Sequence, residues 1–184
     1  MPRKALVLSL LCFLAAFTLA APTPADDGAA PQKSPQADAE RRSRSPHLRQ
    51  GLAAFEQGFY ELLPKGRRAE ADAAFALAMR ELDLALEAEP LNKEAHRALA
   101  RIQSLRQDHL AAAEHYRRLT EIDPLDVDSY ALAALSLAEA GRFAESRIEL
   151  EKAKARTTDE KALALLDGYL AKLAAAEKKA GAGR

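Results

Sequence analysis

A seven-residue pattern at residues 86–92 returns at residues 120–126, and this internal repeat constrains the fold more than any other feature of the chain. Three positions are identical in both copies, each pair 34 residues apart: Glu87/Glu121, Pro90/Pro124 and Leu91/Leu125. The same offset aligns small residues with small residues, namely Ala100 with Ala134 and Ala78 with Ala112. A fixed period of this length is typical of stacked supersecondary units that bury their apolar faces against one another. The chain is therefore expected to fold as an array of similar units.

The composition agrees with a helical array. Alanine is abundant, only 5% of the residues are aromatic, and there is no tryptophan. Alanine loses little entropy in a helix, and its small side chain lets neighbouring helices approach closely. The 27 basic and 27 acidic side chains cancel, so no excess of charge indicates nucleic acid or a membrane surface as a partner. A length of 184 residues predicts one modest domain.

The first 20 residues are interpreted as a signal peptide. Arg3 and Lys4 precede an apolar run at residues 5–21, and Thr18-Leu19-Ala20 has the small residues that a signal peptidase reads, so cleavage is predicted after Ala20. The alternative is an uncleaved membrane anchor, because the run is close to the shortest length that spans a bilayer. The mature protein is expected to be periplasmic or otherwise exported, without stable membrane insertion once the signal peptide is removed.

Residues 21–47 are predicted to form a disordered linker. Between Pro22 and Pro46 no apolar side chain is larger than alanine, apart from the prolines, so this segment cannot bury enough surface to offset its ordering entropy. A basic run at residues 41–45 would contact an anionic partner or simply be solvated. The last residues, 179–184, are expected to be a disordered tail.

Between the linker and the tail, residues 48–178 are predicted to form a domain of seven helices and no strand. Apolar residues recur at spacings of three and four, which is typical of one buried helix face, and proline, glycine and capping residues separate the segments. The expected helices are 48–63, 67–88, 93–106, 109–121, 127–140, 143–156 and 160–178. Asn92 is expected to cap one helix, and Thr157 with Glu160 is interpreted as a capping box at the last. That last helix is expected to cover the end of the stack.

Residues 93–126 and 127–160 resemble two consecutive tetratricopeptide (TPR) repeats. The second of these units matches the family pattern at eight positions: Tyr130, Ala134, Leu137, Gly141, Phe143, Ser146, Leu150 and Ala153. The preceding unit matches at Leu99, Ala100, Ala112, Tyr116 and Pro124. It departs from the pattern at His96, Gln103, Gln107 and His109, and the later unit has Thr158 where the family has proline. A first, degenerate unit matches only at Ala78, Leu82, Ala85 and Pro90.

The resemblance implies an all-α fold, a right-handed superhelical stack of about three TPR-like hairpins plus a C-terminal capping helix. It also implies a concave face lined by the first helix of each hairpin. Members of the family are usually scaffolds that bind peptides or other proteins.

No arrangement of residues indicates catalysis, a metal site or a cofactor. The four histidines, at positions 47, 96, 109 and 115, lack the spacing of helical metal ligands, and His96 and His109 occupy packing positions. Ser129, Ser136 and Ser146 have no neighbouring base in the sequence. Removal of the signal peptide also removes the one cysteine, Cys12, and with it any thiol chemistry. We therefore predict a protein that is not an enzyme and binds no cofactor; a site assembled only by the fold is the alternative.

The candidate partner-binding groove is expected on the first helices of the last two units. Arg97 and Arg101 are four residues apart and would orient an acidic group, while Ala131 and Leu135 at the matching positions would accept an apolar flank. Glu94 lies within reach of Arg97 and could neutralise it instead. A second candidate feature is Phe59-Tyr60 on the first helix. Both rings cannot face one core, so one of them would be exposed; the favoured alternative is that they pack under the extended second helix.

The leading prediction is an exported TPR adaptor that binds another envelope protein or peptide. The alternative is a self-associating module of an envelope complex, in which the first hairpin or the last helix pairs with another copy. Homo-oligomerisation is therefore an open alternative.

Overall fold

The computed structural model describes residues 45–182, and within that range the chain is all-α, with seven α-helices and no strand. This confirms the all-α fold and the predicted number of helices. The predicted signal peptide, residues 1–20, and most of the predicted linker, residues 21–47, lie outside the described residues. None of the helices in residues 45–182 combines the length and the hydropathy needed to cross a bilayer.

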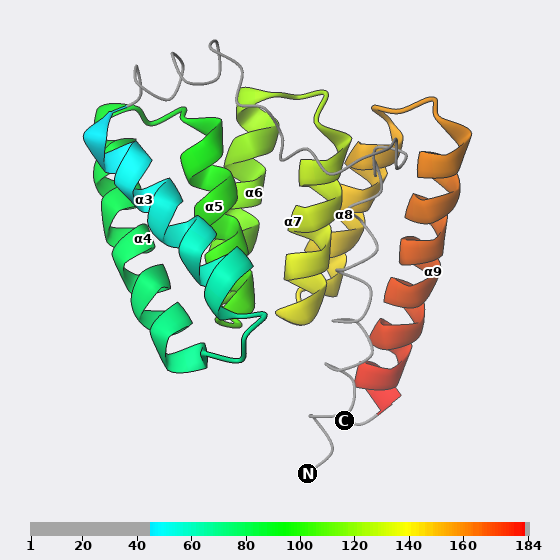
Figure 1. Ribbon diagram of the computed structural model, residues 1–184. Coiled ribbons are helices and arrows are strands. Elements are labelled where there is room, and N and C mark those ends of the chain that lie inside the picture. The colour runs from blue at the N-terminus through cyan, green and yellow to red at the C-terminus, as the bar shows by residue number, and fades with distance from the viewer. Residues whose placement is uncertain (1–44, 183–184) are drawn as a thin grey trace, which may run out of the picture. The chain divides into compact units, whose positions relative to one another are not determined.

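Successive helices run antiparallel and are joined by short loops (Figure 1). The first hairpin consists of α3 (Pro46–Glu56), a continuing π-helical segment η1 (Gln57–Leu62), and α4 (Arg68–Ala88). The second consists of α5 (Lys93–Leu105) and α6 (His109–Ile122), and the third of α7 (Val127–Glu139) and α8 (Phe143–Lys154). The last helix is α9 (Glu160–Ala182), which extends beyond the predicted end at residue 178.

Side-chain caps explain where several helices begin. Asn92 accepts a hydrogen bond from the Ala95 N–H at 3.0 Å, as predicted, and Asp126 accepts one from the Ser129 N–H at 3.2 Å. Helix α3 begins at Pro46, two residues before the predicted boundary, because the Ser45 hydroxyl accepts the Leu48 N–H at 3.1 Å.

The predicted capping box at the start of α9 is wrong. The cap is Asp159, whose carboxylate accepts the Ala162 N–H at 2.8 Å, while the Thr157 hydroxyl accepts only the Asp159 N–H at 3.1 Å. An aspartate directly before the first helical residue has the better position for reaching the free N–H groups of the first turn.

The first hairpin is packed through glycines. A Cβ atom at Gly51 would lie 2.7 Å from Leu82 Cγ and 3.1 Å from the Leu82 nitrogen, and one at Gly58 would lie 2.6 Å from Phe75 Cε1. Only glycine permits this separation between α3–η1 and α4. In the π-helical segment the Leu63 N–H donates to the Gly58 carbonyl at 3.0 Å, a bond that spans five residues.

A buried carboxylate also connects the two helices of this hairpin. Glu81 of α4 is 3% exposed and accepts hydrogen bonds from His47 Nδ1 and from Arg80, both at 2.8 Å. These bonds, the one from His47 first, lower the pKa of Glu81, although burial opposes them.

The small residues that repeat along the chain lie where the helices approach most closely. Ala100, Ala112 and Ala134 are fully buried and Ser146 nearly so, as the repeat predicts. The Ser146 hydroxyl of α8 donates to the Ala134 carbonyl of α7 at 2.7 Å, so a side chain of one helix bonds directly to the backbone of the other in the third hairpin.

Helix α9 packs against α8, as expected of a helix that covers the end of the array. Leu166 and Leu173 of α9 are buried, and two ion pairs, Arg147–Glu177 and Lys154–Asp167, connect the helices at their edges.

Candidate functional site

The predicted binding face lies on α5 and α7, and its four residues differ in accessibility. Arg97 is exposed, Arg101 and Leu135 are partly buried, and Ala131 is only 1% exposed. Ala131 therefore offers almost no surface to a partner.

Arg97 is held by a carboxylate of the next helix. Its Nη2 lies 3.4 Å from Asp126 Oδ2, and Asp126 also accepts the Ser129 hydroxyl at 2.7 Å while capping α7. A guanidinium at this distance from an already bonded carboxylate makes a weak, exposed ion pair. Part of its positive charge is therefore neutralised from the neighbouring hairpin.

Arg101 differs from Arg97, because no carboxylate within residues 45–182 forms an ion pair with it. It lies near the buried Tyr116 of α6. Burial raises the pKa of the Tyr116 phenol, while the charge of Arg101, then a hydrogen bond with Ser104 and last the charge of Arg97 oppose part of this rise. Arg101 is thus a partly buried cation whose charge no acid in the described part of the chain compensates through an ion pair.

Leu105 extends this face, and sequence reasoning did not identify it. It follows Arg101 by one helical turn and is 44% exposed. On the third hairpin, burial and then the charge of Asp126 raise the pKa of Asp128, and the charge of Arg97 opposes this rise. Both carboxylates therefore lie close enough to Arg97 to interact with its charge.

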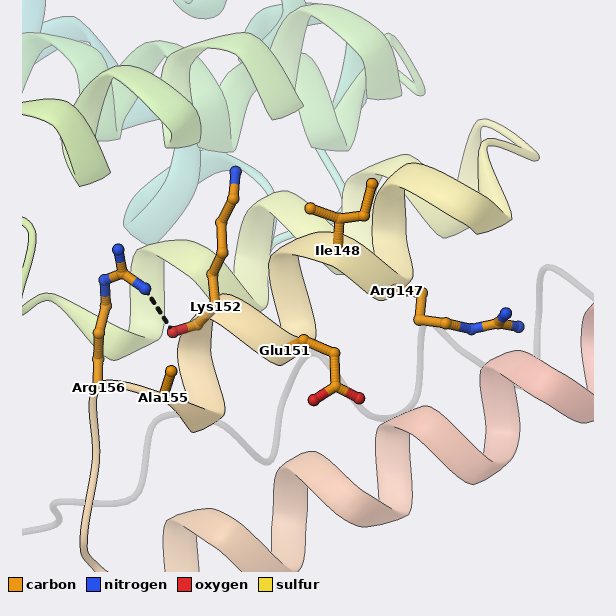
Figure 2. A pocket seen from close by; sticks show the side chains of 6 residues that line it. All are labelled: Arg147, Ile148, Glu151, Lys152, Ala155 and Arg156. Carbon is orange, nitrogen blue, oxygen red and sulfur yellow. Dashed lines mark hydrogen bonds between the residues drawn. The ribbon is translucent and has the colours of Figure 1, made fainter.

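Two of the surface hollows on residues 45–182 lie elsewhere, and neither is lined by a predicted site residue. The larger, about 460 Å³, lies on α8 and is lined by Arg147, Ile148, Glu151, Lys152, Ala155 and Arg156 (Figure 2). The smaller, about 330 Å³, lies where α6, α7 and α8 meet and is lined by Arg117, Thr120, Glu121, Tyr130, Glu149, Lys152 and Arg156. The sequence shows the basic residues, but not that Ile148 between them is left exposed.

A charged network forms the wall of the smaller hollow. Glu149 is only 2% exposed and accepts hydrogen bonds from Arg117 Nε at 3.0 Å and from Lys152 Nζ at 3.2 Å. The guanidinium of Arg156 lies over the Tyr130 ring, 4.4 Å from its centroid, and donates to the Lys152 carbonyl at 2.8 Å. The network joins α6 to α8.

Two histidines form a hydrogen-bonded pair between α5 and α6. His96 Nε2 lies 2.9 Å from the Pro90 carbonyl, and its Nδ1 lies 2.9 Å from Nδ1 of His115. Since a carbonyl only accepts, Nε2 of His96 must donate, so in the neutral pair His115 Nδ1 donates to His96 Nδ1. Burial, followed by the charges of His96 and Arg118, lowers the pKa of His115 to about 4. His96 occupies a packing position, as predicted, with 7% exposure.

The other residues considered for chemistry make structural bonds. Ser129 donates to Asp126 and Ser136 to the Leu132 carbonyl, at 2.7 and 2.9 Å. Within residues 45–182 no three His, Cys, Asp or Glu side chains are grouped so that they could hold a metal ion.

No protein-family model matches the chain, and no curated protein matches it at a significant level.

Proposed function

We propose that this chain is an exported adaptor of the tetratricopeptide type, which binds an acidic segment of another envelope protein on the face formed by α5 and α7. The observation that carries the proposal is Arg101, a partly buried arginine with no ion-pair partner in the described part of the chain. An arginine in this state gains most from a carboxylate that a partner supplies, because burial in the fold has already removed part of the hydration shell of its guanidinium.

The repeat architecture supports the TPR part of the proposal. Buried small residues recur at the same positions of the second and third hairpins, and a residue with positive φ follows the first helix of each, Gln107 and Gly141. Such recurrence is expected of units that stack with one geometry.

The ligand is a peptide segment with a carboxylate next to an apolar side chain. Arg101 would bind the carboxylate in a bidentate way, and Arg97 would contribute a weaker attraction because Asp126 competes for it. The apolar side chain would pack on Leu105 and Leu135, since Ala131 is buried. Nothing in this arrangement requires a cofactor or a catalytic group.

The export part of the proposal depends on the signal-like residues 1–20. Fractionation of the native organism, followed by N-terminal sequencing, should find a protein outside the cytoplasm that starts at Ala21. A cytosolic product that keeps Met1 would contradict export.

The binding part is tested by capture from an envelope extract with the wild-type chain and with Arg97→Glu/Arg101→Glu as bait. The wild type should retain a partner at low salt, and the double variant should not, with unchanged helicity by circular dichroism. Arg67→Glu/Arg68→Glu, which reverses two exposed charges at the N-terminus of α4, is the matched control and should capture normally. Capture of the same partner by the Arg97/Arg101 variant would refute the proposed face.

A further inference from the structure

We propose that His96 and His115 form a binding site for a divalent transition-metal ion with the ligand preference of zinc, which is held between the two Nδ1 atoms that face each other from α5 and α6. The site uses neither arginine of the proposed binding face, so the inference does not depend on the proposed adaptor function.

The two rings are already directed at each other. Nδ1 of His96 and Nδ1 of His115 lie 2.9 Å apart, on the two helices that pack together in the second hairpin. Nitrogens at this distance must share a proton or a metal ion, because two facing lone pairs would repel each other. In the neutral pair the shared atom is the proton of His115. A metal ion that takes the place of this proton accepts one lone pair from each ring.

His96 already has the tautomer that a metal ligand needs. Its Nε2 donates to the Pro90 carbonyl at 2.9 Å, so its Nδ1 carries a lone pair. A backbone carbonyl on the other ring nitrogen is a usual second partner of a metal-binding histidine, because it fixes the tautomer and orients the ring. Burial holds the ring further, since His96 is only 7% exposed.

His115 can take the matching tautomer and loses only the hydrogen bond that the metal replaces. Its Nε2 forms no hydrogen bond with any residue of the range 45–182. In that part of the chain Gln103 Oε1 is the one buried side-chain polar atom without a partner, so Nε2 of His115 is open to water. The proton of His115 therefore moves from Nδ1 to Nε2 through the solvent. The neutral ring then binds the metal without a net release of protons.

The spacing of the rings fits one tetrahedral ion. Zinc binds histidine nitrogen at about 2.0–2.1 Å, so two ligating nitrogens lie about 3.3 Å apart and their ring centroids about 5.2 Å apart. The centroids of His96 and His115 are 5.2 Å apart, with 45° between the ring planes. The two helices therefore keep their separation, and the rings need only tilt until the nitrogens move apart by about 0.4 Å.

The chemistry of the pair selects the kind of ion. Imidazole nitrogen suits zinc, copper and nickel, whereas magnesium and calcium prefer oxygen ligands. Within residues 45–182 no third His, Cys, Asp or Glu side chain groups with the pair, so water completes the coordination of the metal. Arg118, one turn after His115 on α6, would repel a cation, but its guanidinium donates to Glu121 at 2.7 Å. A metal bound here joins α5 to α6 in the hairpin that carries Arg97 and Arg101.

Calorimetric titration of the full chain with zinc chloride at neutral pH tests the proposal. We expect zinc to bind at this site and the midpoint of thermal unfolding to rise with the zinc concentration, because only the folded state holds the two nitrogens together. Magnesium chloride should have neither effect. His96→Asn and His115→Asn should each raise the dissociation constant for zinc at least about tenfold. His109→Asn, which replaces the other partly buried histidine of α6, is the matched control and should bind zinc like the wild type.

Nitrogen-15 NMR of the wild-type imidazoles decides the question even if a variant fails to fold. Zinc should shift the Nδ1 resonances of His96 and His115 and leave those of His47 and His109 in place. Unshifted resonances of His96 and His115 would overturn the proposal and leave the two rings as a hydrogen-bonded pair only. Equal zinc affinity of the wild type and of both folded variants would overturn it as well.

Discussion

Gln107 and Gly141 occupy the same position in two successive hairpins, 34 residues apart, and both have a positive φ, 65° and 76° respectively. Each residue lies in the turn after the first helix of its hairpin, where the chain reverses direction. Glycine adopts this conformation without strain, whereas the Cβ atom of glutamine makes it unfavourable. The turn geometry is therefore set by the repeat, and the residue at position 107 conforms to it at a cost.

Replacement of Gln107 by glycine should stabilise the protein. Relief of the left-handed strain outweighs the greater entropy of an unfolded glycine, so we expect a gain of about 0.5–1 kcal/mol in the free energy of unfolding. Urea denaturation followed by circular dichroism measures the change. An equal or lower stability would show that the strain at residue 107 is negligible.

The reverse change at the equivalent turn should be destabilising. Gly141→Val places a β-branched side chain at positive φ, although no atom lies within 4 Å of the added Cβ, so the cost comes from the backbone alone. We expect a loss of about 1–2 kcal/mol by the same measurement. A neutral result would mean that the turn relaxes to a different conformation.

Gly51→Ala should destabilise the first hairpin, because the new Cβ would lie 2.7 Å from Leu82 Cγ. We expect a loss of about 1–3 kcal/mol from overpacking. The matched control is Gly168→Ala in α9, where nothing lies within 4 Å of the added methyl group. That substitution should stabilise the protein by about 0.5–1 kcal/mol through helix propensity. Similar effects at both positions would contradict the close approach of α3 and α4.

Ala134→Arg tests the packing of the third hairpin. Ala134 is fully buried, and its carbonyl accepts the Ser146 hydroxyl at 2.7 Å, so a long charged side chain cannot be placed without separating α7 from α8. We expect a loss of roughly 3 kcal/mol or more, enough to unfold a small array. An unchanged midpoint of thermal unfolding would show that the repeat alignment is incorrect.

The His96–His115 pair should make stability depend on pH. The pKa of His115 is lowered from 6.5 to about 4 in the folded state, so between these values the unfolded chain binds more protons. The associated stability is fully present above about pH 6.5 and is lost as the pH falls towards about 4. Since His115 is only partly buried, solvent screening reduces the loss to about 1–2 kcal/mol.

His115→Asn is the control for this pH dependence, because the amide keeps a donor near His96 Nδ1 but does not titrate. Urea denaturation at pH 7 and pH 4.5 should show a smaller loss of stability for the variant than for the wild type. Carboxylates that titrate in this range are common to both proteins and cancel in the comparison. Equal losses would contradict the depressed pKa.

The helices and their closest contacts could be predicted from the sequence because they repeat. Asn92, Ala100 and Ala134 each have a role that follows from period and spacing, and the structure places them accordingly. The requirement for Gly51 and Gly58 could not be predicted, since it depends on how far α3 lies from α4. A glycine in a helical segment has no signature that distinguishes close packing from a tolerated weak position.

The candidate sites were only partly predictable for the same reason. The spacing of Arg97 and Arg101 places them on one face of a helix, but whether each meets an acid depends on the next hairpin, where Asp126 reaches Arg97 alone. The burial of Ala131 and the exposure of Leu105 and Ile148 likewise arise from packing between helices that are distant in the sequence.

The central claim, that an acidic segment binds at Arg101, is tested most directly by titrating the captured partner's acidic segment, as a synthetic peptide, into single variants by calorimetry. Arg101→Gln should weaken binding at least about tenfold, because it removes an uncompensated cation from the contact. Arg97→Gln, which removes a cation already paired with Asp126, should weaken it less. Equal affinity of the wild type and Arg101→Gln for the peptide would contradict the claim.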